Sequence, residues 1–214
     1  MICSLCKNPN SVLFARDRRR EYWRCALCAL VYVPEQYFLN AAQEKAEYDL
    51  HRNDPDDAGY RQFLSRLTAA LLPKLPASSS GLEFGCGPGP ALAAMLSEAG
   101  HEVTLYDPFY AFDPPALERS YDFIAATEVV EHLHRPGLEL DRLWSLLRPG
   151  GWLGVMTKLV IDVEAFQRWH YKNDPTHVVF FSRQTWTWWA ARRSAELEFV
   201  GQDVMLLRKP CGVD

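Results

Sequence analysis

A glycine-rich turn, Glu-Phe-Gly-Cys-Gly-Pro-Gly at residues 83–89, constrains the fold more than any other feature of the chain. It follows a short apolar stretch and precedes residues 90–99, whose spacing predicts a helix. Glycine permits positive φ angles and lets a ligand lie close to the backbone. This order of strand, turn and helix is typical of the first unit of a nucleotide-binding α/β sheet, although Pro90 stands where the dinucleotide pattern requires glycine.

Acidic residues accompany the turn. Glu83 lies two residues before Gly85, and Asp107 follows an apolar run at 103–106 that predicts the next strand. An acidic residue at this point of such a sheet accepts hydrogen bonds from ribose hydroxyls. The predicted cofactor-binding residues are therefore those of the turn, its two acids and a threonine that follows a later strand: Glu83, Gly85, Cys86, Gly87, Gly89, Asp107 and Thr127.

Two further segments follow in a set order. Residues 121–126, Tyr-Asp-Phe-Ile-Ala-Ala, predict a fourth strand, and residues 147–153, Leu-Arg-Pro-Gly-Gly-Trp-Leu, predict the turn into a fifth. Together with the glycine turn and Asp107, this set resembles the class I S-adenosylmethionine (SAM) methyltransferases over residues 58–208. The resemblance implies an α/β, Rossmann-like sheet of the seven-stranded type, with SAM as the methyl donor. Residues 108–120 are short and rich in proline, so we expect a degenerate third strand.

Apolar spacing predicts the remaining elements. We expect helices at 58–72, 90–99, 128–133, 137–147 and 185–193, and strands at 81–84, 103–106, 121–126, 152–156, 197–200 and 204–207. The last two strands would form a closing hairpin. That hairpin and Pro90 both disfavour an NAD-dependent oxidoreductase.

Four cysteines form two Cys-x-x-Cys pairs near the start of the chain, namely Cys3, Cys6, Cys25 and Cys28. This spacing suits a tetrahedral zinc site, with each pair on a tight turn. A segment of about 30 residues cannot bury an adequate core alone, so zinc would supply folding free energy. Unrelated thiols are the alternative. We therefore predict a zinc ribbon at 1–33, a connector at 34–57 and a methyltransferase domain at 58–214.

Charge is unevenly distributed along the chain. Residues 1–33 contain six basic and two acidic residues, whereas the whole chain has a net charge of −4. The run formed by Arg16, Arg18, Arg19 and Arg20 could bind RNA or another anionic partner. The alternative is a solvated hairpin tip, whose charge keeps an exposed strand edge from pairing.

The segment Thr-Glu-Val-Val-Glu-His at 127–132 lies beyond the fourth strand, at the sheet edge where ligands bind in such folds. On a helix, Glu128, Glu131 and His132 would share one face, and with His177 they could hold a divalent cation. The helix dipole alone also favours acidic residues in a first turn. Without a metal, His132 or His177 could act as a general base.

This Glu-x-x-Glu-His pattern, followed later by a histidine before an aromatic run, resembles two groups of metal-dependent O-methyltransferases. One group acts in the ubiquinone pathway, and the other methylates the 2′-oxygen of small RNAs. By that resemblance the catalytic set and its metal ligands are Glu128, Glu131, His132 and His177, with Mg²⁺ or Mn²⁺ as the cation. Such a cation lowers the pKa of an acceptor hydroxyl and orients it toward the methyl group.

The favoured interpretation is a SAM-dependent methyltransferase that methylates an oxygen of a small molecule. Two alternatives stay open. One is an RNA methyltransferase that grips RNA with the basic ribbon, and the other is a non-catalytic adaptor that binds SAM only as a structural relic. The sequence shows no signal peptide and no apolar run of membrane-spanning length, so it predicts a cytoplasmic protein without membrane contact.

Overall fold

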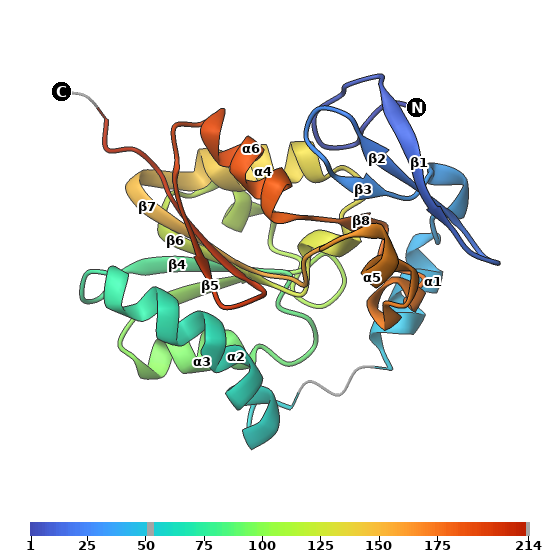
Figure 1. The fold of residues 1–214 in the computed structure, drawn as a ribbon. Coiled ribbons are helices and arrows are strands. Elements are labelled where there is room, and N and C mark those ends of the chain that lie inside the picture. Colours follow the sequence, from blue (N-terminus) through green and yellow to red (C-terminus); the bar gives the residue numbers. More distant parts are fainter. Residues whose placement is uncertain (51–53, 213–214) are drawn as a thin grey trace.

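A six-stranded sheet with the order β5-β4-β6-β7-β10-β9 forms the centre of the molecule. The computed structural model describes residues 1–50 and 54–212 (Figure 1), so residues 51–53 of the predicted connector and the last two residues lie outside the described part. Strands β5, β4, β6 and β7 run parallel, and β10 pairs antiparallel with both β7 and β9. The predicted closing hairpin is therefore confirmed.

The elements of this sheet lie close to their predicted positions. The strands are β4 (Ser80–Phe84), β5 (Glu102–Tyr106), β6 (Tyr121–Thr127), β7 (Leu147–Met156), β9 (Glu196–Val200) and β10 (Val204–Arg208). The helices are α2 (Ala58–Leu71), α3 (Ala91–Glu98), α4 (Pro136–Leu146) and α6 (Arg183–Ala191). Figure 1 shows α2 and α3 on one face of the sheet and α4 and α6 on the other, so apolar side chains cover both faces.

The third strand of the predicted seven is absent from residues 108–120. In its place the short 3-10 helix η3 (Pro114–Glu118) packs beside β5, and the Tyr121 hydroxyl donates a hydrogen bond to the carbonyl of Ala116 at 2.8 Å. Prolines at the start of η3 fix φ and remove backbone donors, which suits a tight turn and disfavours a ladder strand. The expectation of a degenerate third strand is confirmed, and β5 becomes an edge of the sheet.

The predicted helix at 128–133 is wrong. Only the 3-10 turn η4 (Val130–His132) forms there, and Glu128 adopts a left-handed φ of 52° before it. The cause is the continuation of the sheet, since the Glu128 amide still donates to the carbonyl of Met156 at 2.8 Å. Glu128 therefore cannot share a helical face with Glu131 and His132.

A second sheet joins the start of the chain to a strand that precedes α6. Strands β1 (Ser11–Arg16), β2 (Glu21–Cys25) and β3 (Val31–Tyr32) form the ribbon, and β8 (Val179–Phe180) pairs with β3 (Figure 1). The helix α5 (Val163–Gln167) packs against β1 on this side. The ribbon thus shares backbone hydrogen bonds with the segment predicted as methyltransferase domain.

The connector holds a helix that the sequence did not lead us to expect, α1 (Ala41–Tyr48). Asn40 caps it, accepting a hydrogen bond from the amide of Gln43, whose side chain in turn accepts one from the amide of Asn40. Few residues of this helix are apolar, and its single buried residue is the charged Glu44. The apolar spacing that predicted the other helices is therefore missing here.

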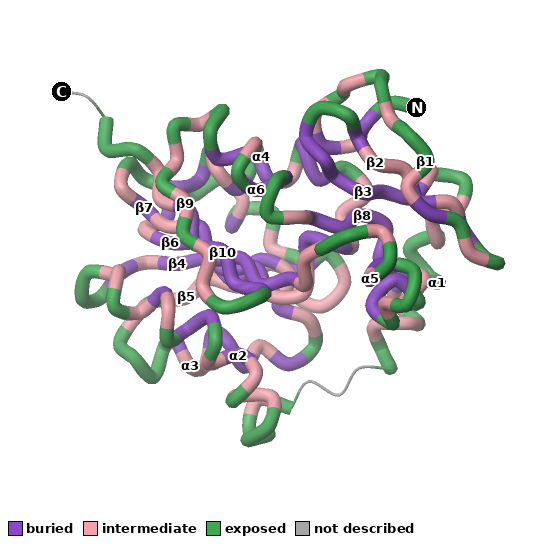
Figure 2. Tube along the Cα trace, viewed as in Figure 1, coloured by how far each residue is buried: buried purple, intermediate pink, exposed green. Residues whose placement is uncertain are grey.

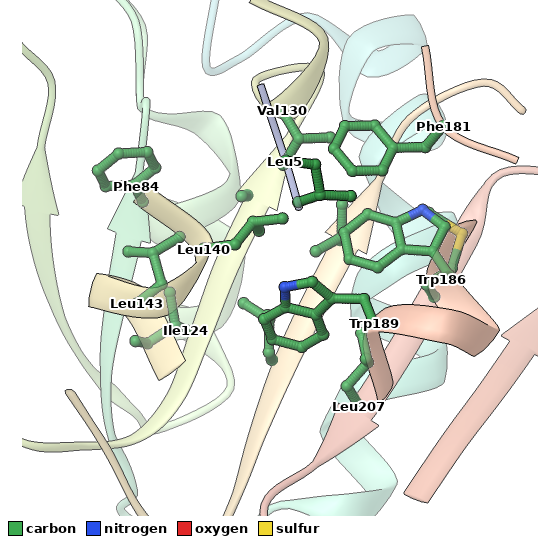
Figure 3. Packing of buried hydrophobic residues seen from close by; sticks show 14 of the residues in the cluster. Leu5, Phe84, Ile124, Val130, Leu140, Leu143, Phe181, Trp186, Trp189 and Leu207 are labelled. Atoms are coloured by element: carbon green, nitrogen blue, oxygen red, sulfur yellow. The ribbon is translucent and has the colours of Figure 1, made fainter. Parts of the chain in front are cut away.

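Burial follows the two sheets. Figure 2 shows buried segments along the central strands and along β3 and β8. The largest apolar cluster contains ribbon residues as well as residues of the central sheet, and Figure 3 shows Leu5 of the ribbon among Val130, Phe181 and Trp186. Ribbon and central sheet therefore bury a common core. In the described part of the chain, no helix is long and apolar enough to cross a membrane.

Candidate active site

A cavity of about 650 Å³ opens at the carboxyl ends of β4, β5, β6 and β7. The segments that follow these four strands line it, and they include Gly85, Asp107, Glu128 and Lys158. In parallel sheets the carboxyl edge is where ligands bind, because the connections that leave the strands there enclose a crevice. Two parts of its lining, which we call its two ends, differ in chemistry.

The glycine turn forms the first end. Gly85 and Gly87 have φ angles of 77° and 61°, a region that side-chain-bearing residues rarely adopt. A Cβ on Gly85 would lie 2.5 Å from a methyl carbon of Val129, so a side chain at this position would clash with Val129. Cys86 is buried and lines the cavity, and its thiol pKa is raised to about 12 by burial. Gly89 is buried and does not line the cavity.

Asp107 connects the turn with the loop after β5. Its carboxylate accepts hydrogen bonds from the amides of Gly87 at 3.0 Å, Phe109 at 2.8 Å and Tyr110 at 3.1 Å. A carboxylate has about four acceptor positions, so these three bonds leave room for one ribose hydroxyl. The residue is 7% exposed and lines the cavity. The structure therefore brings Asp107 to the predicted place beside the glycine turn.

Glu83 lies beneath the turn, at the first turn of α3. Its carboxylate accepts a hydrogen bond from the amide of Ala93 at 2.9 Å, and the residue is 4% exposed. Burial raises the pKa of this carboxyl to about 8, against the lowering effect of the Ala93 amide. Thr127, at the end of β6, is half-buried and lines the cavity between the two ends.

The second end holds the predicted catalytic residues. Ligand atoms of Glu131, His132 and His177 all lie within 4.8 Å of one another. Glu131 is fully buried behind the cavity wall, whereas His132, His177 and Glu128 line the cavity itself. The structure thus brings three of the four predicted ligands together from η4 and from the loop before β8, and leaves Glu128 outside that group.

Tyr171 links the members of this cluster. Its hydroxyl donates a hydrogen bond to Glu131 and lies 3.3 Å from Oε2 of Glu128, and its carbonyl accepts one from Nδ1 of His177 at 2.7 Å. A carbonyl can only accept, so Nδ1 of His177 carries a proton, and Nε2 lies 3.7 Å from Oδ2 of Asp174. A backbone carbonyl that orients an imidazole in this way is one of the usual partners of a metal-ligating histidine.

Burial governs the carboxyl groups of this end. It raises the pKa of Glu128 to about 7 and that of Glu131 to about 8, and the charge of Glu128 adds to the effect on Glu131. Among the residues that the structure describes, the buried atoms Glu128 Oε1 and Glu131 Oε2 have no hydrogen-bond partner. Buried carboxylate oxygens without a donor are costly, and a cation held by the cluster would satisfy the oxygen of Glu131.

Two residues at this end escaped the sequence analysis. Tyr48 of α1 lines the cavity with its ring 5.3 Å from that of His132. Glu44, also on α1, lies 2.7 Å from His134, so the connector helix closes one side of the cavity. Their sequence offered no signal, because α1 lacks an apolar face and the contacts span long separations in the chain.

The four ribbon cysteines come together as predicted. The Sγ atoms of Cys3 and Cys28 are 3.6 Å apart, those of Cys6 and Cys25 are 3.5 Å apart, and all four lie within 4.8 Å of one another. Sulfurs bound to one zinc at about 2.3 Å stand about 3.8 Å apart in a tetrahedron. The donor set and its spacing therefore fit zinc.

The basic run of the ribbon has partners within the protein. Arg16 pairs with Glu21, and Arg19 donates a hydrogen bond to the carbonyl of Asn173 at 3.3 Å. Arg20 is only 7% exposed, and its guanidinium points into the loop before β8. Arg18 is exposed at the hairpin tip. The run is therefore not a uniform solvated face.

Comparisons with known proteins agree on the fold. A family model described as a methyltransferase domain matches residues 57–198. A SAM-dependent methyltransferase of Archaeoglobus fulgidus is 16% identical, with 70% of this chain and 94% of that chain covered and a TM-score of 0.53. A chain of the complex between the Haloferax volcanii Trm112 methyltransferase activator and a methyltransferase is 13% identical, with coverage of 77% and 98% and a TM-score of 0.53.

No curated protein matches the chain. The two structural likenesses show a shared fold, and the family match spans the glycine turn, Asp107 and the cluster around Glu131. The chain accordingly belongs to the methyltransferase family and is a SAM-dependent methyltransferase.

Proposed function

We propose that this methyltransferase transfers the methyl group of SAM to a hydroxyl oxygen of a small molecule, and that a divalent cation held by Glu131, His132 and His177 assists the transfer. One observation carries the proposal. The glycine turn with Asp107 and the cluster of carboxyl and imidazole groups occupy two ends of the same cavity. A donor bound at one end and an acceptor bound at the other can therefore meet.

The donor end suits a nucleoside with a charged tail. The left-handed Gly85 and Gly87 leave space against the backbone, and the Asp107 carboxylate can accept a hydrogen bond from a ribose hydroxyl. SAM supplies an electrophilic methyl group on a sulfonium. Gly89 supports the start of α3 from behind, since its carbonyl accepts a hydrogen bond from the Ala91 amide at 2.8 Å.

The acceptor end suits a divalent cation. One carboxylate and two imidazoles within 4.8 Å form a mixed oxygen and nitrogen donor set. Two imidazoles favour Mn²⁺ over Mg²⁺ on affinity, and both ions accept oxygen ligands. When bound, the cation would lower the pKa of an acceptor hydroxyl and hold it in place. Tyr171 supports the set from behind, through its hydroxyl on Glu131 and its carbonyl on His177.

The groups present account for the bond that forms, the bond that breaks and the proton that leaves in the transfer. The acceptor oxygen forms a bond to the methyl carbon while the bond from that carbon to sulfur breaks, and the electron pair of that bond stays on sulfur to give S-adenosylhomocysteine. The hydroxyl proton passes to the carboxylate of Glu128, which lines the cavity beside the cluster. This assigns Glu128 a proton-accepting role in place of the ligand role predicted from the sequence.

The size and lining of the cavity favour a small acceptor over RNA. Aromatic side chains of α1 and of the loop after β5, including Tyr48 and Phe109, line the cavity, with ring centroids 5.7 Å apart. In addition, Arg19 and Arg20 hold backbone carbonyls of the protein, which leaves fewer ribbon charges for phosphates. RNA as the acceptor is therefore the second candidate.

The test uses methyl-labelled SAM with a cell extract split into small-molecule, RNA and protein fractions. We expect the small-molecule fraction to gain label with the parent protein, and Glu131→Gln and His177→Ala to lose at least about 100-fold in rate while SAM affinity stays within about twofold. The matched control is Glu164→Gln, at an exposed glutamate of α5, which should transfer at the parental rate.

Three results would count against the proposal. Label in the RNA fraction alone would assign the acceptor to RNA. Undiminished transfer by Glu131→Gln and His177→Ala would remove the cation. Loss of SAM binding in the same two variants would show that they act on the donor end. Variants serve better than a chelator here, because a chelator would also strip zinc from the four cysteines.

A further inference from the structure

We propose that the ribbon contributes to the active site. Its residue Arg20 is a positioning residue that holds the loop carrying Tyr171 and His177. The inference rests on the proposed function only in assigning that loop to the acceptor end of the cavity. We call residues 170–177 the acceptor loop. It begins with the 3-10 helix η5 (His170–Asn173) and ends at His177.

The Arg20 side chain binds the backbone of the acceptor loop. Its guanidinium donates hydrogen bonds to four carbonyls of the loop, those of Lys172, Asp174 at 2.9 Å, Pro175 at 3.2 Å and His177 at 2.9 Å. A planar guanidinium with five donors can bridge several carbonyls, which a lysine ammonium cannot match in geometry. Because these acceptors are backbone atoms, the contact fixes the path of the loop.

Further contacts hold the same loop to the hairpin tip. The Lys172 ammonium donates to Asp17 at 2.8 Å, and the Tyr22 hydroxyl donates to the same carboxylate at 2.9 Å. Burial alone would raise the pKa of Asp17, but the hydrogen bonds from Lys172 and from backbone amides outweigh it and lower that pKa. Asp17 is therefore a fixed negative charge between the ribbon and the acceptor loop.

Hydrogen bonds from the ribbon also reach the segments that carry the predicted metal ligands. The Val33 amide donates to the carbonyl of Val178 at 2.8 Å, and the Val178 amide donates to the carbonyl of Glu131 at 2.9 Å. Strand β3 also pairs with β8, which begins two residues after His177 (Figure 1). Backbone hydrogen bonds thus run from the ribbon through Val178, the residue after His177, to the glutamate of the cluster.

The four-cysteine cluster and the central core hold the other side of the ribbon. Cys25 and Cys28 stand shortly before β3, and the Cys25 amide donates to the carbonyl of Leu30 at 2.9 Å. The carbonyl of Leu5 lies against Gly137 of α4, where a Cβ would come within 2.4 Å of it. Leu5 itself packs beside Val130 and Phe181 (Figure 3). The ribbon is therefore held firmly against α4 and the central core, so Arg20 can position the acceptor loop.

The experiment compares Arg20→Ala with Arg16→Ala in the full-length protein. Arg16 is the matched control, since it lies on the same hairpin and pairs with Glu21 of the ribbon. In Arg20→Ala we expect hydrogen exchange in residues 171–178 to rise about tenfold and Mn²⁺ affinity, titrated with the metal alone, to fall about tenfold. SAM affinity and exchange in β4 should stay at parental values, and millimolar guanidinium ion should restore Mn²⁺ binding.

Arg16→Ala should match the parent in every readout. Unchanged exchange and unchanged Mn²⁺ affinity in Arg20→Ala would overturn the inference, and so would weakened Mn²⁺ binding that guanidinium does not restore. A parent protein that binds no Mn²⁺ would refute the cation of the proposed function, and the exchange of residues 171–178 would then decide the role of Arg20 by itself. If Arg20→Ala does not fold, Arg20→Lys takes its place, with smaller changes in the same directions.

Discussion

The donor end and the acceptor end of the cavity are built in different ways. The donor end is local in the chain, because the glycine turn, α3 and Asp107 follow one another within a short stretch and bond mainly to one another. The acceptor end is assembled from distant segments. Glu131 meets the acceptor loop through Tyr171, 40 positions away, and Arg20 meets the same loop through His177, 157 positions away.

The two ends depend on different parts of the molecule. The donor end depends on backbone geometry that the strands of the sheet impose directly, so it needs few side chains from elsewhere. The acceptor end depends on a ribbon and a loop that lie outside the central sheet. The two ends should accordingly respond to different substitutions.

Substitution in the four-cysteine cluster, whose donor set fits zinc, should have the largest effect. In Cys25→Ser/Cys28→Ser we expect the melting temperature to fall by about 10 °C or more, because a zinc held there would contribute folding free energy and the ribbon shares a core with the sheet. Methyl transfer should fall to background. Calorimetry with SAM below the melting transition should show affinity within about threefold of the parent. Full transfer by this variant would contradict the account, and Cys211→Ser, at an exposed thiol, is the control.

Substitution of Asp107 should damage the donor end alone. Asp107→Asn removes the negative charge of the carboxylate that accepts hydrogen bonds from the amides of Gly87, Phe109 and Tyr110 and from the ribose hydroxyl. SAM affinity should therefore fall about 100-fold, or about 2.7 kcal/mol. Mn²⁺ affinity should not change. Calorimetric titrations with each ligand measure both quantities. Equal losses of SAM and Mn²⁺ affinity would mean that the two ends are coupled, and Glu118→Gln on η3 serves as the neutral comparison.

The reverse pattern is expected for Tyr171→Phe. This change removes the hydroxyl that donates to Glu131 and keeps the carbonyl that holds His177, so Mn²⁺ affinity should fall about tenfold while SAM affinity is retained. Titration of Mn²⁺ followed by electron paramagnetic resonance gives the affinity. Tyr121→Phe, whose hydroxyl donates to Ala116 beneath the sheet edge, should leave both affinities intact. Parental Mn²⁺ affinity in Tyr171→Phe would show that the Tyr171 hydroxyl does not support the metal-binding residues.

The smallest effect concerns the pH dependence of stability at the donor end. Burial raises the pKa of Glu83 in the folded protein to about 8, above its ordinary value, so its stabilising contribution is fully present below about pH 4.5 and is lost as the pH rises through 8. Across that window the free energy of unfolding of the parent should carry a slope of about −1.4 kcal/mol per pH unit from this group. Glu83→Gln, which can still accept the Ala93 amide, should lack that slope.

Urea unfolding of parent and Glu83→Gln at pH 6 and pH 7, without SAM, measures the difference. The carboxyl groups of the acceptor end titrate equally in both proteins, so they cancel in the comparison. Parallel pH profiles for the two proteins would show that Glu83 is ionised in the folded state, and would refute the protonated carboxyl beneath the glycine turn.

The backbone geometry of the glycine turn was predictable because its sequence signals are local. Glycine at fixed spacing, an apolar strand before it and an acid after the next strand all act within one strand, turn and helix, and the structure places Gly85, Gly87 and Asp107 accordingly. The two cysteine pairs were predictable for the same reason, since each pair occupies one tight turn. The proline-rich stretch at 108–120 likewise signalled the missing third strand.

The acceptor end was predicted only in part. Glu131, His132 and His177 come together, but the helix assumed for Glu128 does not form, because the β6–β7 ladder extends through its amide. Arg20 looked like one charge among four, and only the folded chain shows that it is buried among carbonyls. Contacts between distant segments leave no periodic pattern, so α1 and its Tyr48 could not be anticipated either.

The most direct test of the account is anomalous X-ray diffraction at the manganese edge, from crystals grown with Mn²⁺ and S-adenosylhomocysteine. We predict one manganese peak bounded by Glu131, His132 and His177, with the nucleoside lying against Gly85 and Asp107 at the other end of the same cavity. Manganese bound elsewhere, or no manganese beside these three side chains while the nucleoside occupies its end, would contradict it.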